Sequence, residues 1–190
     1  MKEGDYYYIF KNSKKINTPM GQIVKTKFQS LADKLVNDLI TFGESPTDPV
    51  SIVAFHFAMI DFFSTMPRAE LEQSVAVGLD RENDWTFNCP SAEPEFKMKW
   101  MGIFGTSTSN AKNGRDWLSS LSLIQLCAVC VTGRALESVN IPFIITNYIS
   151  HDNIKVFARE IVERYPFIKI EELIKIIENY MFYFSLEKNL

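Results

Sequence analysis

The chain has 190 residues, of which 46% are hydrophobic and 23% are charged, and its formal net charge is −3. These values exclude a disordered or fibrous chain, and they are typical of a globular protein with one sizeable core or with two small lobes that share a central element. Because the charge balance is slightly acidic and the basic residues are scattered, we expect no nucleic acid partner and no membrane insertion.

The N-terminal sequence and the cysteines bear on the compartment. The sequence MKEGDYYYIF lacks the charged, apolar and small-residue succession of a secretory signal, and it is unlike an Arg-rich presequence. We therefore expect a cytoplasmic bacterial protein, or a protein of the mitochondrial matrix only if a presequence has been removed. Three cysteines, Cys89, Cys127 and Cys130, are too few for a disulfide framework, so we expect reduced thiols.

The first 43 residues predict a small sheet covered by a helix. An aromatic run, the turn chemistry of residues 11–13 and a second alternating segment indicate an antiparallel meander over residues 5–28. A helix should follow, capped by Ser30 with Asp33 and ended by Gly43. Its apolar residues fall on one face, which would cover the sheet: Leu31, Leu35, Val36, Leu39 and Ile40.

Residues 48–66, DPVSIVAFHFAMIDFFSTM, predict the helix around which we expect the rest of the chain to be organised. Asp48 is suited to cap its start and Pro49 to occupy its first position. The apolar side chains point in nearly every direction, so this helix should be buried on most of its circumference. Because it is short and is interrupted by His56 and Asp61, its apolarity indicates a protein core and not a bilayer span.

A third helix is predicted to begin at Pro67, because proline is pre-set for the first helical position. Leu71, Val75 and Leu79 recur at intervals of four and should form its inner face. The following residues, 80–90, combine charge and turn residues with a short piece that suits a strand.

We place a lobe boundary after this piece. Residues 1–88 would form an N-terminal α+β lobe, and residues 89–190 would form a C-terminal helical lobe. In the second lobe a helix should begin at Pro94 and end at Gly105, and the polar residues 106–114 predict a flexible loop.

The remainder of the chain predicts helices. Residues 115–137 predict one long apolar helix, with a pause at residues 140–142 because proline removes a donor and restricts the residue before it. Residues 143–149 are ambiguous between helix and strand. Asp152 should cap the next helix, and the last helix should span residues 170–184. The fold class is therefore α+β, with a small antiparallel β-meander covered by helices in the N-terminal lobe and an all-helical C-terminal lobe.

We assign no residue of this sequence to catalysis, to a cofactor or to a metal. Cys127 and Cys130 form a C-x-x-C in the middle of an apolar helix, whereas a redox pair needs an exposed helix start and a zinc site needs two further ligands. Core packing is expected for both. His56 and His151 are far apart and lack a nucleophile motif, so we predict His56 as a hydrogen-bonded structural histidine. An enzyme that uses Cys127, Cys130 or His56 is an alternative that requires one of them in an accessible pocket.

Aromatic and methionine residues are concentrated in two segments, one near residue 100 and one over residues 180–184. Such side chains suit adaptable apolar contacts with a protein partner. The hypothesis names five partner-binding residues: Trp100, Met101, Tyr180, Phe182 and Phe184. The alternative is that these side chains close the core of the helical lobe, since apolar stripes at helical spacing are usually core.

The first half of the chain also resembles a known family in the order and spacing of its motifs. An aromatic strand and a K-N turn lead to KINTPMG at 15–21 and then to a second strand. A helix opens with LADKL at 31–35 and ends with Gly-Glu at 43–44, and an apolar helix finishes with Ile-Asp at 60–61. Together, across residues 6–75, this succession resembles the ATP synthase assembly chaperones that bind the alpha subunit of the catalytic head.

The resemblance implies a non-enzymatic chaperone that uses no cofactor and shields the apolar surface of a free alpha subunit from aggregation. The chain departs from the family at several places. Leu39 and Phe42 stand where the family has tryptophan and glutamine, and residues 171–190 lack its acidic helix and W-G pair. These departures leave an alternative, which is a divergent protein-interaction or scaffold domain of the same fold with an unrelated partner.

Overall fold

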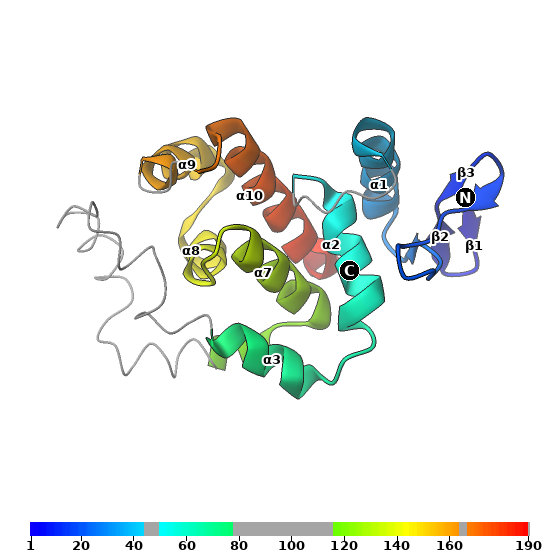
Figure 1. The fold of residues 1–190 in the computed structure, drawn as a ribbon, viewed down its shortest axis with the longest axis horizontal. Coiled ribbons are helices and arrows are strands. Elements are labelled where there is room, and N and C mark those ends of the chain that lie inside the picture. Colours follow the sequence, from blue (N-terminus) through cyan, green and yellow to red (C-terminus); the bar gives the residue numbers. More distant parts are fainter. Residues whose placement is uncertain (44–49, 78–115, 164–166, 190) are drawn as a thin grey trace.

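The structure is a computed structural model that describes residues 1–43, 50–77, 116–163 and 167–189. It has an α+β fold in which short antiparallel strands gather at one end of the molecule, beside α1, and helices form the rest (Figure 1). The predicted fold class is confirmed.

Five short strands lie in the described residues, and their bounds are β1 (Lys2–Glu3), β2 (Tyr6–Tyr8), β3 (Phe10–Lys11), β4 (Lys14–Lys15) and β5 (Lys25–Thr26). The first sheet has the order β1-β2-β5, and Tyr7 pairs with Lys2 and Thr26 on its two sides. β3 and β4 form a hairpin whose turn residues, Asn12 and Ser13, have positive φ angles of 49° and 63°. A two-residue hairpin turn that matches the right-handed twist of its strands requires positive φ at both central residues, so the predicted turn is confirmed.

Helix α1 (Gln29–Phe42) covers the sheet with its inner face, where Leu31 and Leu35 are buried. Two residues predicted for this face, Val36 and Ile40, are instead exposed, so that part of the prediction is wrong. The inner face of α1 instead includes Asp38. This side chain can be buried because its carboxylate has hydrogen-bond partners inside the protein.

Of the two predicted ends of α1, the C-terminal end is confirmed and the N-terminal cap is wrong. Gly43 ends the helix with a φ of 84°, a conformation that glycine adopts without strain, as predicted. The predicted cap at Ser30 is wrong, because Ser30 lies inside the first turn and Phe28 occupies the capping position without a side-chain hydrogen bond.

Helix α2 (Ile52–Ala58) begins later than predicted and is capped by Ser51, while the predicted cap Asp48 and first position Pro49 lie outside the described residues. The Ser51 hydroxyl accepts a hydrogen bond from the Val53 backbone N–H at 3.2 Å. The Asp38 carboxylate, supplied by α1, accepts the first backbone N–H of the helix at 2.7 Å and the Ser51 hydroxyl at 3.1 Å. A carboxylate stabilises a helix N-terminus, and this one comes from a neighbouring helix, which explains why the local sequence pointed elsewhere.

Helix α2 continues into the π-helix η1 (Met59–Phe63), and every residue of the run 52–57 except Ala54 is buried. The prediction of a largely buried central helix is therefore confirmed for this stretch. At its far end Phe62 is half exposed, so the buried character fades within η1.

Further along the chain lie α3 (Arg68–Val77), a short helix at 116–120, α7 (Leu123–Ala135), α8 (Asn140–Tyr148), η3 (His151–Asn153), α9 (Ile154–Val162), α10 (Ile170–Phe184) and η4 (Leu186–Asn189). The predicted single helix at 115–137 is wrong. It is divided by a capping box in which Ser122 and Gln125 each accept the other's backbone N–H, at 3.2 and 2.9 Å.

The starts of α8 and α9 differ from the prediction. Pro142 lies in the first turn of α8, where a backbone N–H has no partner within the helix, so the chain breaks before residue 140 and not at it. Asp152 lies in η3 and gives no side-chain cap to α9. The bounds of α10 agree with the predicted 170–184.

One hydrophobic core contains residues from both sides of the predicted lobe boundary, including Phe55 of α2, Cys127 of α7 and Ile177 of α10. These helices contact one another, and Arg68 of α3 donates to the Leu121 carbonyl at 2.6 Å. The boundary itself, with the predicted strand and the helix and loop that should follow it, lies in residues 78–115, outside the described part.

Candidate functional site

His56 connects three elements beneath the sheet. Its Nε2 is 3.0 Å from the backbone carbonyl of Lys25, and its Nδ1 is 3.1 Å from the hydroxyl of Tyr183. Since a carbonyl only accepts, Nε2 carries the proton and Nδ1 accepts from the tyrosine. Burial lowers the pKa of His56 from 6.5 to about 4. His56 is thus a neutral, hydrogen-bonded structural histidine, as predicted, and it ties β5 to α2 and α10.

The π-helix η1 places the next residues against the N-terminal segment. The Ser64 N–H donates to the Met59 carbonyl at 2.9 Å, five residues back, so this turn holds one more residue than an α-helical turn. Asp61 is thereby buried and accepts a hydrogen bond from the Thr18 hydroxyl at 2.5 Å. The Thr-Pro corner and the Ile-Asp helix end, two motifs on which the family resemblance rests, are therefore in contact.

A cavity of about 710 Å³ is bounded by β5 and by the helices α1, α2, η1, α7 and α10, and we call it the lysine-rimmed cavity. Its residues come from the sheet and the loop before β5 (Tyr6, Gly21, Gln22, Ile23, Lys25, Thr26, Lys27), from α1 and its cap (Phe28, Leu31), from the central helix (His56, Met59, Ile60, Ser64, Thr65) and from α7 and α10 (Ile124, Tyr183). The volume is in the range of ligand sites, and the inner wall is largely apolar.

The charge of this cavity has one sign. Lys25 of β5 and Lys27, just after its end, reach the same ring, since their amines lie 4.7 and 5.4 Å from the centre of Tyr6. No acidic side chain is among the residues that line the cavity, and neither lysine forms an ion pair within the described part of the chain. The rim therefore carries positive charge that the described residues do not neutralise.

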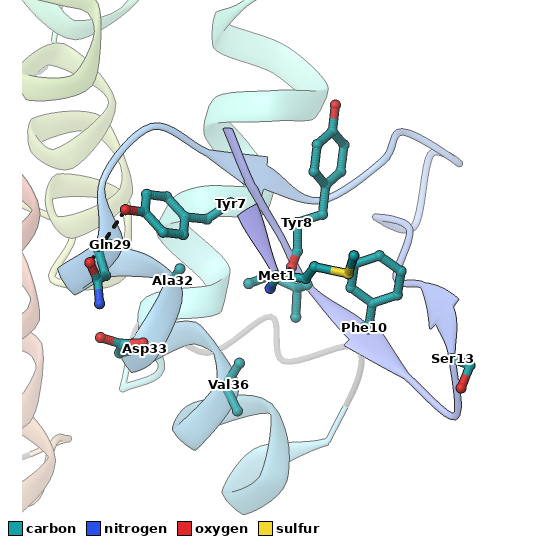
Figure 2. A pocket seen from close by; sticks show the side chains of 10 residues that line it. Met1, Tyr7, Tyr8, Phe10, Ser13, Gln29, Ala32, Asp33 and Val36 are labelled. Carbon is teal, nitrogen blue, oxygen red and sulfur yellow. Dashed lines mark hydrogen bonds between the residues drawn. The ribbon is translucent and has the colours of Figure 1, made fainter. Parts of the chain in front are cut away.

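A second hollow, of about 570 Å³, lies between the strands and α1, and we call it the α1 groove (Figure 2). Its residues are Met1, Tyr7, Tyr8, Ile9, Phe10, Ser13, Gln29, Ala32, Asp33 and Val36. The Tyr7 hydroxyl donates to the side chain of Gln29 at 3.3 Å and closes one end. The groove is aromatic and aliphatic, and its single charged side chain is that of Asp33.

The apolar lining of the groove continues onto the outer surface of α1. Val36 belongs to the groove and is 41% exposed, and Ile40, one turn further along the helix, is 79% exposed. Phe42 at the end of the helix is 44% exposed. Val36 and Ile40, four residues apart, share one side of the helix and form an exposed apolar face of the type that binds protein partners, whereas Phe42 points to another side.

The predicted partner-binding residues do not meet on one surface of the described part. Tyr180 and Phe184 are buried, with ring centres 5.4 Å apart, and Tyr180 shares hydrogen bonds with Thr146 and with the Pro142 carbonyl. This is the core packing of the alternative interpretation. Phe182 is half-buried beneath the amine of Lys34, 4.7 Å from its ring centre. Trp100 and Met101 lie outside the described residues.

The cysteine pair of α7 points to packing. Cys127 is fully buried and donates weakly to the Phe55 carbonyl at 3.4 Å, and Cys130 is partly buried. Burial raises the pKa of both thiols, most strongly that of Cys127, which keeps them protonated and poorly nucleophilic. His151, the other histidine, is exposed in η3, away from both hollows.

Sequence reasoning missed the residues that shape both hollows. Tyr6, Lys25 and Lys27 are predicted only as part of the β-meander, and Val36, which lines the α1 groove, is predicted on a covered face. One local signal could have found the lysines, because side chains two residues apart in an extended segment point to the same side of the chain.

Comparisons with protein-family models, with curated proteins and with solved structures find no match. Within the described residues no helix has the length and apolarity needed to cross a membrane, and no three His, Cys, Asp or Glu side chains are grouped as metal ligands would be.

Proposed function

We propose that this chain is a non-enzymatic protein-binding factor that acts as an assembly chaperone, with the free alpha subunit of ATP synthase as its partner. The observation that carries the binding role is the exposed apolar face of α1 formed by Val36 and Ile40, which adjoins the α1 groove through Val36. The identity of the partner is carried by the resemblance of residues 6–75 alone.

Masking is the physical basis of the proposed activity. A subunit that waits for its assembly partner exposes apolar surface, and a transient interface removes that surface from competition with aggregation. An apolar helix face beside a groove suits this task, because the groove receives protruding side chains and the helix face covers flat apolar area.

The competing enzyme hypothesis depends on Cys127, Cys130 or His56. Cys127 is fully buried. His56 does line the lysine-rimmed cavity, but both of its ring nitrogens are occupied by protein groups. These observations favour a binding role over nucleophilic or acid–base chemistry at these residues.

The second candidate function is an interaction or scaffold module with an unrelated partner. It is favoured by the C-terminal residues, in which α10 packs Tyr180, Tyr183 and Phe184 into the core and lacks the family's acidic signature. Both functions would use the same face of α1, so the partner is what separates them.

The test uses the purified chain and the purified alpha subunit of ATP synthase from the same organism. We expect a complex in size-exclusion chromatography and suppressed aggregation of the free subunit. Ile40→Asp should weaken binding by about tenfold or more, because it places a charge in an apolar interface. Val156→Asp, an equally simple change at a valine that is 54% exposed on α9, is the matched control and should bind as the parent does.

Absence of any complex would exclude the alpha subunit as partner and leave the scaffold alternative. A complex that Ile40→Asp and Val156→Asp weaken to the same extent would show that the face of α1 is not the binding surface.

A further inference from the structure

We infer that the lysine-rimmed cavity receives a segment of the protein partner in which apolar side chains are flanked by aspartate or glutamate. The inference rests on the proposed protein-binding function and adds the chemistry of what is recognised. It does not depend on which protein that partner is.

The interior of the cavity accepts apolar side chains. Met59 and Ile60 of η1 and Ile124 of α7 form part of its wall, and Ile23 stands 45% exposed at its edge. Two polar side chains of the helical wall are already engaged, since both ring nitrogens of His56 have partners and the Ser64 hydroxyl donates to the Ile60 carbonyl at 2.6 Å. A polar group inserted deeply would lose its hydration without finding a partner, so an apolar side chain is favoured there.

The rim selects for carboxylates. The amines of Lys25 and Lys27 converge on Tyr6, and the lining includes no acidic residue. Two ammonium groups held near one ring repel each other, and an incoming carboxylate relieves that repulsion while forming charge-assisted hydrogen bonds. An apolar segment with acidic flanks satisfies the interior and the rim together.

The charge distribution of the chain orients such a partner. Residues 1–28 contain six lysines and two acidic residues, a formal charge of +4, whereas the whole chain carries −3. The remaining residues, 29–190, therefore carry −7. An acidic segment is attracted to the strand-bearing end and repelled elsewhere, and complementary fields of this kind set orientation and association rate.

The cavity and the α1 groove both border the first turn of α1. Phe28 and Leu31, at the start of α1, line the cavity, and Gln29 and Ala32, on the same turn, line the α1 groove. One partner that covers the outer face of α1 can therefore place a neighbouring segment in the cavity.

The test uses the full chain and a fluorescein-labelled peptide with a central leucine–phenylalanine pair between aspartates, followed by fluorescence anisotropy. We expect saturable binding that Lys25→Glu with Lys27→Glu weakens by about tenfold or more. The matched control is Lys11→Glu with Lys14→Glu on the β3–β4 hairpin, which changes the net charge equally and should leave the affinity unchanged. Ser64→Trp, which fills the cavity from an exposed position, should abolish binding with all lysines retained.

Equal weakening by the two double variants would reveal diffuse attraction to a basic surface and overturn the inference. Equal binding of a peptide with lysines in place of the aspartates would also overturn it, as would retention of binding by Ser64→Trp. Octanoate carries one carboxylate on an apolar chain, and its binding more tightly than the peptide would identify a small-molecule site and overturn the inference as well. The outcome is separable from that of the proposed function. Peptide binding without an alpha-subunit complex would remove the proposed partner and keep the cavity site, and an alpha-subunit complex without peptide binding would do the reverse.

Discussion

The two hollows beside the first turn of α1 differ in how the chain builds them. The α1 groove is made entirely from residues 1–36, and its lining is close in sequence. The lysine-rimmed cavity needs His56, Ile124 and Tyr183, which come from three helices that are far apart in sequence. Substitutions in a surface built from neighbouring residues should change stability little. A surface assembled by the tertiary fold shares its residues with the core, so substitutions there should also lower stability. Binding and stability should therefore separate at the groove and be coupled at the cavity.

The largest expected difference is between two tyrosines. Tyr183, at the floor of the cavity, is 1% exposed and lies 5.7 Å from Phe55 between ring centres, so Tyr183→Ala should lower the free energy of unfolding by about 3–5 kcal/mol. Tyr8, in the groove, is half-buried with the amine of Lys15 on its ring, and Tyr8→Ala should cost about 1 kcal/mol. Urea unfolding of both variants measures the difference, and equal losses would contradict it.

The next effect is the pH dependence that His56 imparts to the cavity frame. Because burial lowers its pKa from 6.5 to about 4, the folded state favours the neutral ring. Its contribution to stability is complete above pH 6.5 and is lost as the pH falls towards 4, by about 3 kcal/mol in total. Unfolding measured across this range should show the loss in the parent chain.

His56→Gln is the control for that titration, since the carboxylates are the same in both chains. The difference in unfolding free energy between parent and variant should shrink as the pH falls from 6.5 to 4. A constant difference would mean that His56 does not titrate with a lowered pKa.

The smallest expected effect is at the outer face of α1. Val36→Ser with Ile40→Ser should change the free energy of unfolding by no more than about 0.5 kcal/mol, because both side chains are exposed. Leu35→Ala in the same helix, at a fully buried position, should cost about 2–5 kcal/mol. Thermal unfolding of the two variants compares the faces directly, and a large loss from the serine variant would show that the outer face is covered in the folded chain.

Local sequence signals predicted the elements whose causes are local. The hairpin turn at Asn12 and Ser13, the end of α1 at Gly43 and the span of α10 each depend on residues within the element. The division before α7 was also readable, since Ser122 and Gln125 have the spacing of a capping box, but the apolar run on both sides concealed it.

Other features depend on residues that are distant in sequence. Asp38 caps α2 from another helix, and this contact both shifts the start of α2 and brings a carboxylate to the inner face of α1, against the apolar pattern. The candidate site is of the same kind. His56 could be predicted as a buried structural histidine, but its partners on β5 and α10 could not, because strand pairing and helix packing decide them.

The π-helical turn η1 is in effect a one-residue insertion in a continuous helix. An α-helix advances about 100° for each residue, so removing Met59 or Ile60 would restore α-helical hydrogen bonding and rotate the residues after the deletion by that angle relative to α2. Asp61 would then turn away from Thr18, and Ser64 would leave the cavity edge. The number of residues in this helix, more than the identity of any one of them, therefore fixes how the strand-bearing end is oriented relative to the other helices.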